Sequence, residues 1–593
     1  MTTSVVVVVM GLRSAVPPRS FRRPPASARP LLHRTCTVPA PIIPGGRNRH
    51  GRGAPTSGTE REARMVRTSI LSRSSFWLKA GLAVALAALA DLFFVWHEPG
   101  STVGLFALAW LAALAVARPG LLRGRRALVA VLAAAVFALV LIDRPGLLAW
   151  ALFGLSLGIA AMSARVRAAE PAWAWAQRLV VLGAAGLVGP LLDLFRLSRL
   201  KRRRAGRSAM ALLGLLLMPA AGGAVFLALF AAANPLISDF FAGLSGPALS
   251  VDGVVRAGLW GVVAVMSWGA LRPRWRRKLI ALPSRGAARS SPALTTSITW
   301  SLIVFNAVFA LQNGLDIAFL WSGAPLPGDM GLADYAHRGA YPLIVTALLA
   351  GLFVLVALQP GSDTAQRPLV RRLVVVWVAQ NIILVASSLL RTADYIEAYA
   401  LTRFRIAAMV WMALVGVGLL LICWRMLRDR PGHWLINANV AVSLVVLAVI
   451  SVVDLGAVAA AWNIRHAREV GGRGVELDLG YLRSLGAPAL VSLVELEQTT
   501  DDPDLRDRTA AVRREVLAGV RRGQGEWRGW TWRDQRRLDG VEALTRGRPL
   551  SPPKPGPRHL DGRLIPPPPP AAVPALPPAP PPASEPLTSS AGG

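Results

Sequence analysis

The sequence predicts an all-α fold: a polytopic integral membrane bundle of about 11–12 transmembrane helices with a small soluble helical domain near the C-terminus. Three observations lead to this prediction. Only 17% of the 593 residues are charged and 53% are hydrophobic, which is too little charge to cover a soluble protein of this size. Apolar runs long enough to cross a bilayer recur along the chain. Basic residues gather in the short loops between these runs, as they do in cytoplasmic loops.

The strong positive charge limits the partners to be expected. The chain has 66 basic and 33 acidic residues, a net charge of +33, which in a soluble protein would suggest a nucleic-acid ligand. No basic and aromatic module of the known kinds occurs, so we expect no nucleic-acid partner. The anionic headgroups of the lipid bilayer are the expected partner of the basic loops. Because Cys423 lies in an apolar run, we expect no disulfide with the only other cysteine, Cys36.

Composition divides the chain into five parts. Residues 1–64 are rich in arginine and proline and have no apolar period, which indicates a disordered arm or upstream translation, with Met65 as the natural start. We expect N-terminal transmembrane helices over 65–207, a C-terminal transmembrane core over 208–462 and a soluble helical domain over 463–545. The proline content of 546–593 predicts a disordered, partly polyproline tail.

Apolar runs predict the individual helices, several of them close to the shortest length that spans a bilayer. The predicted ranges are 76–96, 101–117, 127–142, 147–163, 179–195, 209–232, 254–271, 295–321, 340–358, 373–390, 406–424 and 436–462.

The helix predicted at 179–195 raises a question of parity. Segments 165–178 and 196–207, on either side of it, both carry the basic residues typical of cytoplasmic loops. Either this helix, which contains Pro190 and Asp193, does not cross the membrane, or one of the short earlier helices does not. The sequence leaves both alternatives open.

The charge of the later loops predicts their orientation. Segments 196–207, 272–289, 359–372 and 425–434 together hold 20 basic residues, whereas 233–253, 322–339 and 391–405 hold 4. The first set is therefore expected in the cytoplasm. It follows that the protein is expected to be multi-pass in the inner (plasma) membrane, with the C-terminal domain on its outer side.

Motifs of known chemistry are absent from the sequence. No phosphate-binding glycine loop, zinc-binding histidine or cysteine spacing, or cofactor fingerprint occurs. The stretch "GLSLG" at 154–158 has the letters of a nucleophile elbow, but Ser156 lies inside an apolar helix instead of following a strand. We therefore predict no catalytic residue, no cofactor and no metal site.

The most informative signal is a set of polar residues in the late helices. Asn306, Asn313 and Asp316 share one helical face by spacing, and Arg391 shares another with Gln380 and Ser387. Polar groups in hydrocarbon are costly, so both faces should point into the bundle and pair there, with Asp316 the expected partner of Arg391. Such pairs often only fix the register of helices. The candidate polar cluster is Asn306, Asn313, Asp316, Arg338, Arg391, Asp394, Glu397, Arg403 and Asp454.

Several stretches resemble bacterial membrane proteins of the domain-of-unknown-function families 4153 and 4173. They are "FNAVFALQNGLDIAFLWSG" with the following "LADYAHRGAYPL" (305–343), "LLRTADYIEAYALTRFRI" (389–406), "INANVAV", "AWNIRHA" and "LDLGYLRSLGAPAL". The resemblance covers roughly 76–540 and implies a multi-helix membrane core followed by a helical C-terminal segment. It implies no activity. The matching residues are Asn306, Gln312, Tyr335, Arg338, Gly339, Arg391, Tyr395, Glu397, Tyr399, Leu401, Thr402, Arg403 and Asn463.

Three functional hypotheses remain open from the sequence. The polar faces at membrane depth favour a transporter or permease-like protein. A membrane scaffold or signalling partner that presents its C-terminal domain to a membrane or envelope protein is the first alternative. A membrane enzyme acting on lipid or cell-wall substrates, with Asp394 and Glu397 as acid and base, ranks last because no metal or nucleophile accompanies them.

Overall fold

A computed structural model describes residues 59–163, 170–202, 251–273, 292–322 and 367–566, together with a few single positions between them. The chain divides into two compact units, residues 1–68 and residues 69–593. The predicted helix 209–232, most of the predicted helix 340–358, and both ends of the chain lie outside the described residues.

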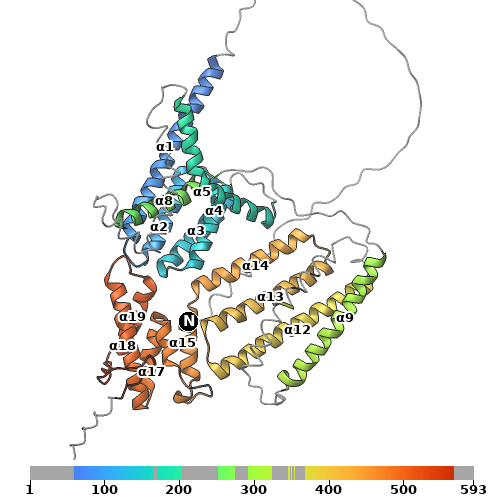
Figure 1. The fold of residues 1–593 in the computed structure, drawn as a ribbon, viewed down its shortest axis with the longest axis vertical. Coiled ribbons are helices and arrows are strands. Elements are labelled where there is room, and N and C mark those ends of the chain that lie inside the picture. Colours follow the sequence, from blue (N-terminus) through green and yellow to red (C-terminus); the bar gives the residue numbers. More distant parts are fainter. Residues whose placement is uncertain are drawn as a thin grey trace, which may run out of the picture. The chain divides into compact units, whose positions relative to one another are not determined.

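The described residues form helices and no strand, which confirms the all-α prediction (Figure 1). In the membrane part these are α1 (Thr59–Phe94), α2 (Thr102–Ala117), α3 (Arg125–Asp143), α4 (Leu147–Ser163), α5 (Ala172–Arg202), α8 (Val251–Leu271), α9 (Pro292–Asp316) with the π-helical turn η2 (Ile317–Trp321), α12 (Pro368–Tyr399), α13 (Arg403–Leu427) and α14 (Gly432–Val452). The C-terminal part contains α15 (Leu455–His466), α16 (Leu479–Leu485), α17 (Leu490–Thr499), α18 (Pro503–Gly525) and α19 (Trp532–Thr545).

Seven of the helices in the described ranges are long and apolar enough to cross a membrane. They are α1 from Phe76, α3, α8, α9 continued through η2, α12, α13 and α14, and the apolar helices α2 and α4 are slightly shorter. The protein is therefore a membrane-spanning helical bundle. In the later part, α9, α12, α13 and α14 lie side by side in that order (Figure 1).

The N-terminal helices α1 to α4 share an apolar core with α8. Rings of Phe106, Trp110, Trp150 and Phe153 pack against one another there, with centroids 5.5–6.3 Å apart. Gly104 of α2 lies so close to α3 that a Cβ atom would stand 2.5 Å from the backbone nitrogen of Ile142. The missing side chain lets the two helices approach, as small residues do in membrane bundles.

Contacts with residues 455–566 show which ends of the helices lie together. The Arg528 Nε donates to the carbonyl of Leu92 in α1 at 2.9 Å, and the Arg533 Nε donates to Asp143 at the end of α3 at 2.7 Å. An Arg533 amino group also donates to the carbonyl of Val452, the last residue of α14, at 2.8 Å. We call this the domain end of the bundle and the opposite one the far end.

Helix α5 contacts α14 and α8, and both contacts lie at the far end of the bundle. The Ala172 N–H at its start donates to Asn437 Oδ1, near the start of α14, at 2.8 Å. Asp193 accepts from the Trp268 indole at 3.1 Å and pairs with Arg272 at 3.2 Å, where α8 finishes. Since α8 begins near the domain end, where Arg256 pairs with Asp91 at 2.8 Å, α5 does not run between the two ends. This favours the first alternative for the predicted helix 179–195.

The single helix predicted over 436–462 is wrong. Helix α14 ends at Val452, Val453 is extended, and Asp454 caps α15 by accepting from the Ala457 N–H at 3.2 Å. Aspartate is among the strongest N-cap residues, and a new helix start at this point satisfies its carboxylate without burying it in hydrocarbon. Asp454 therefore does not belong to a membrane-depth face.

Helices α15 to α19 enclose a separate apolar core, in which Leu479, Leu482, Leu490 and Leu493 are fully buried. An Arg513–Glu497 ion pair of 2.7 Å lies inside it and joins α18 to α17.

Residues 546–566 fold back onto α18, although they belong to the segment expected to be a disordered tail. The Lys554 N–H donates to Asp507 at 2.7 Å, and Arg558 pairs with the same carboxylate at 2.8 Å. Burial is the largest single effect on the pKa of Asp507 and raises it, but these partners together hold the pKa below its ordinary value. The remaining residues of the predicted tail lie outside the described part.

Candidate functional site

Amide side chains line the contact between the parallel helices α9 and α12. The Asn306 amide donates to the carbonyl of Leu373 at 3.1 Å, and the Gln380 amide donates to Asn306 Oδ1 at 3.3 Å. Two turns further along α9, the Asn313 amide donates to the carbonyl of Gln380 at 3.1 Å. We call these three amides, together with Asp316 and Arg391, the polar row. Its hydrogen bonds fix the register of the two helices within the apolar bundle.

The polar row ends toward the domain end in an ion pair. Arg391 donates to Asp316 Oδ1, and the Gln312 amide donates to the same oxygen at 3.0 Å. The Asp316 side chain is 0% exposed and the Arg391 side chain 7%. The pairing that the sequence predicts is therefore present, and its burial makes each charge depend on the other.

Some acceptors of the polar row are unused within the described residues. Asn313 Oδ1, Asp316 Oδ2 and Gln380 Oε1 are buried and accept no hydrogen bond. A buried acceptor with no donor costs free energy, so a natural protein usually has a reason to keep it.

The turn between α12 and α13 is held by the C-terminal part. The Leu401 N–H donates to Asn463 Oδ1 at 2.7 Å, and the Asn463 amide donates back to the Leu401 carbonyl at 2.9 Å. Both groups are buried, and Ala400 next to them has a φ of +66°. The Arg403 N–H donates to the Tyr481 hydroxyl at 3.1 Å. We call this set of contacts the turn clamp.

Aromatic and basic side chains complete the turn. The rings of Tyr395 and Tyr399 have centroids 4.8 Å apart, and the Arg405 guanidinium lies 4.4 Å from the Tyr395 ring. Arg405 also donates to the carbonyls of Tyr399 and Ala400. These carbonyls follow the last turn of α12, where no further helical N–H is available, so the guanidinium satisfies them.

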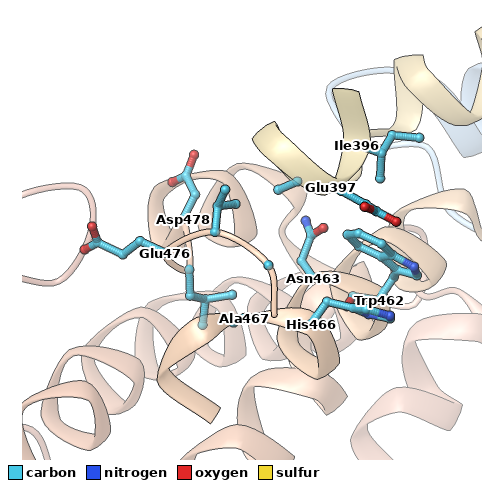
Figure 2. A pocket seen from close by; sticks show the side chains of 12 residues that line it. Ile396, Glu397, Trp462, Asn463, His466, Ala467, Glu476 and Asp478 are labelled. Carbon is cyan, nitrogen blue, oxygen red and sulfur yellow. The ribbon is translucent and has the colours of Figure 1, made fainter. Parts of the chain in front are cut away.

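A small pocket lies beside the turn clamp (Figure 2). It is bounded by Ile396 and Glu397 of α12, by Trp462, Asn463 and His466 of α15, and by the chain around residues 474–478. The His466 ring stacks on Trp462 at 4.1 Å, and its Nδ1 lies 2.8 Å from the Trp462 carbonyl. The cavity volume is only about 10 Å³, enough for one water molecule and not for a substrate.

The acid and base hypothesis gains no support at this place. Glu397 is exposed and Asp394 half-buried. No group of three or more histidine, cysteine, aspartate or glutamate side chains that could hold a metal occurs among the described residues. Ser156, in the sequence resembling a nucleophile elbow, lies in the middle of α4.

A third group of polar residues joins the domain end of the bundle to α19, and the sequence did not predict it. Asp454 pairs with Arg537 and, at 3.5 Å, with Arg144. Asp143 pairs with both Arg533 and Arg536. We call these six residues the arginine cluster. The stretch "EWRGWTWRDQRR" (526–537) supplies three of its four arginines, Arg533, Arg536 and Arg537.

Burial and charge act against each other in the arginine cluster. Burial alone raises the pKa of Asp454, but Arg537, the Ala457 N–H, Arg144 and Arg533 together lower that pKa below its ordinary value. Burial also lowers the pKa of Arg144, which the neighbouring Asp454 offsets in part. The cluster is therefore most stable with Asp454 ionised.

Comparison with known proteins places the chain in a family. A protein-family model described as "domain of unknown function (DUF4153)" matches residues 127–496. The chain belongs to the DUF4153 family. No curated protein and no solved structure matches it. The DUF4153 region runs from α3 to α17 and contains both the polar row and the turn clamp.

The predicted site residues of this DUF4153 protein fall into separate places. Asn306, Asn313, Asp316 and Arg391 come together in the polar row. Arg403 belongs to the turn clamp, and Asp394 and Glu397 lie in the last turns of α12 beside it. Asp454 lies in the arginine cluster, and Arg338 lies outside the described residues. A functional role for the nine residues stays a prediction.

The buried ion pair predicts a non-additive pair of substitutions. Asp316→Asn or Arg391→Gln alone should destabilise the protein by about 3–5 kcal/mol, because each leaves one charge buried without its counter-charge. The double variant should recover part of that loss. Thermal unfolding of the four proteins in one detergent measures this. Asp394→Asn, which removes a half-buried carboxylate of the same helix, serves as the control, and single variants as stable as this control would contradict the expectation.

The turn clamp predicts a local change on loss of one amide. Asn463→Ala leaves the N–H and the carbonyl of Leu401 buried without partners, so the turn should open and destabilise the protein by about 2–4 kcal/mol. Hydrogen exchange of residues 399–405 should rise. Asn439→Ala is the matched control, because within the described residues the Asn439 amide donates to the carbonyl of Leu435 in its own helix. Equal exchange in both variants would show that Asn463 does not hold the turn.

The arginine cluster predicts a dependence on pH. The folded pKa of Asp454 lies below its ordinary value. The ionised carboxylate therefore contributes fully to the free energy of unfolding above the ordinary pKa of about 4, and this contribution is lost as the pH falls through the lowered folded value. Asp454→Asn should therefore unfold at a lower temperature than the parent protein at pH 7, with a gap that closes below about pH 4. A gap that persists unchanged at lower pH would mean that the charge of Asp454 is not what stabilises the cluster.

Proposed function

We propose that this protein is a scaffold of the inner membrane that holds its helical C-terminal domain at the outer face for a membrane or envelope protein partner. The observation that carries the proposal is the pair of hydrogen bonds between Asn463 and the backbone of Leu401. They attach the domain to the turn between α12 and α13. Leu401 in this turn lies 62 residues before Asn463 in the chain.

The attachment is more extensive than simple anchoring requires. A domain that needed only a membrane anchor could follow its last helix on a flexible linker. Here only Val453 and Asp454 separate α14 from α15. The domain also contacts α1 through Arg528, α3 through the arginine cluster and the start of α2, where the Ser101 N–H donates to the Trp530 carbonyl at 2.7 Å. Such an arrangement fixes the orientation of the surface that a partner would meet.

Charge supports the outer placement of the domain. The described ends of the basic loops, among them Arg272, Arg367 and Arg428, lie at the far end, where α3 also begins with Arg125 and Arg126. By the positive-inside rule this end belongs in the cytoplasm, so the domain end belongs outside. With α5 not crossing, the basic segments before and after α5 both fit the cytoplasmic side.

A transporter is the second candidate, and the polar row is what favours it. Buried amides and an ion pair at membrane depth occur along substrate and ion pathways. The unused acceptors of Asn313, Asp316 and Gln380 could serve a polar solute during a transport cycle.

The proposed orientation predicts opposite labelling at two glycines. Neither Gly120, beyond the far end of α2, nor Gly519, in α18, has a neighbouring atom within 4 Å of an added Cβ. In a background with Cys36→Ser and Cys423→Ala, a membrane-impermeant maleimide should label Gly519→Cys in intact cells. It should label Gly120→Cys only after the membrane is opened. The reverse pattern would place the C-terminal domain in the cytoplasm.

Paired variants separate the scaffold from the transporter. Photo-cross-linkers on α18 should capture a defined partner in the parent protein, and Asn463→Ala should reduce that yield at least about fivefold while the protein stays in the membrane. Asn313→Ala with Gln380→Ala should leave cross-linking unchanged. If a phenotype of the gene depends on the two amides of the polar row and not on Asn463, the transporter replaces the scaffold.

A further inference from the structure

Two adjoining cavities lie at the far end of α3. The first has a volume of about 400 Å³ and is lined by Gly120, Leu121, Gly124, Arg125, Arg126, Ala127 and Ser163. The second has a volume of about 470 Å³ and is lined by the same two arginines and by side chains of α3, α4 and α14. Both volumes fall within the range of ligand sites, roughly 300–1,000 Å³. Arg125 and Arg126 line both cavities, so the two adjoin at these side chains.

The two cavities differ in character. The first lies in the loop between α2 and α3, where backbone and the two guanidiniums are available, whereas the Ser163 hydroxyl donates to the Ala160 carbonyl at 2.9 Å. The second follows the membrane-spanning parts of α3 and α4 and is lined by Val129, Phe137, Leu152 and Ile159, with Leu444 of α14 opposite. A ligand that fills both must therefore have a polar end and an apolar end.

Among the described residues, the positive charge at the junction of the cavities has no counter-charge. Arg125 and Arg126 are exposed, and neither makes an ion pair or a hydrogen bond with another described residue. They open α3, whose N-cap is Gly124 and whose first turn contains no acidic residue. The N-terminal end of the helix adds partial positive charge at the same place. The polar end of the ligand should accordingly be anionic.

We propose that this site binds one anionic phospholipid of the leaflet at the far end, with its phosphate at Arg125 and Arg126 and an acyl chain in the apolar cavity. Basic pockets between transmembrane helices are the usual place for anionic headgroups. A small phosphorylated solute would leave the apolar cavity unused. A zwitterionic lipid would bring an ammonium group toward the two guanidiniums, so it should bind less well.

The chain offers a matched pair of arginines for comparison. Arg367 and Arg372 are also exposed and also lie at the start of a membrane-spanning helix, α12, but they line neither cavity. Substituting either pair with glutamine removes the same charge from the same end of the bundle. Only the first pair belongs to the proposed site.

The test is a titration of phosphatidylglycerol into the delipidated full-length protein, followed by native mass spectrometry. Each arginine near an anionic lipid surface contributes roughly a factor of five. Arg125→Gln with Arg126→Gln should therefore raise the Kd of the tightest lipid by about 25-fold. Arg367→Gln with Arg372→Gln should change it less than about twofold. Equal effects of the two pairs, or phosphatidylethanolamine binding as tightly as phosphatidylglycerol, would overturn the proposal.

Two further measurements test the apolar half. Ala133→Phe places a ring in the apolar cavity, which Ala133 lines, and should weaken lipid binding at least about fivefold. Ala112→Phe, on the exposed face of α2, should not. Glycerol 3-phosphate, which has the headgroup charge without acyl chains, should not displace the lipid. Displacement by glycerol 3-phosphate would mean that the site takes a phosphorylated solute. Either that result or unchanged lipid binding by Ala133→Phe would overturn the lipid proposal.

Discussion

The absence of water in the bilayer core is the constraint on which the rest of this structure depends. Every polar group inside it must find its partner within the protein. In the described part of the later helices, Asn306, Asn313 and Gln380 bond to backbone or to one another, and Arg391 meets Asp316. The first role of the polar row is thus to fix the register of α9 against α12. A purely structural role does not explain the acceptors that the polar row leaves unused among the described residues.

Where the helices leave the bilayer, arginine–carboxylate ion pairs take the place of the amide hydrogen bonds found in the polar row. The turn clamp still uses one amide, Asn463, because the backbone of Leu401 is buried. Outside it, Arg533 and Arg537 meet Asp143 and Asp454, whose charges are partly solvated. Ion pairs in that setting cost less desolvation than inside the bundle. The domain is therefore attached by ion pairs where the contact is partly solvated and by the Asn463 amide where the contact is buried.

Much of the membrane part could be predicted from the sequence because hydrocarbon imposes simple rules. Hydropathy locates the spans, and the spacing of Asn306, Asn313 and Asp316 places them on one face, from which the Asp316–Arg391 pair follows. Asp454 shows where this reasoning ends. The apolar run continues from α14 to α15 without a proline, so composition alone predicts one helix. At the break, Asp454 caps α15 and also pairs with Arg537, which lies 83 residues further along the chain. The arginine cluster was missed for the same reason, since its partners are set by folding and not by local spacing.

Arginines at the two ends of the bundle illustrate how one residue type serves two purposes. At the domain end, Arg533 and Arg537 have carboxylate partners within the chain, so their energy depends on folding and on pH. At the far end, Arg125 and Arg126 have none in the described part, so their energy depends on what the membrane supplies. A chain with twice as many basic as acidic residues has too few carboxylates to give each arginine a partner of its own. The proposed lipid site therefore predicts that the far end of this protein responds to the lipid composition of the membrane, whereas the attachment of the C-terminal domain does not.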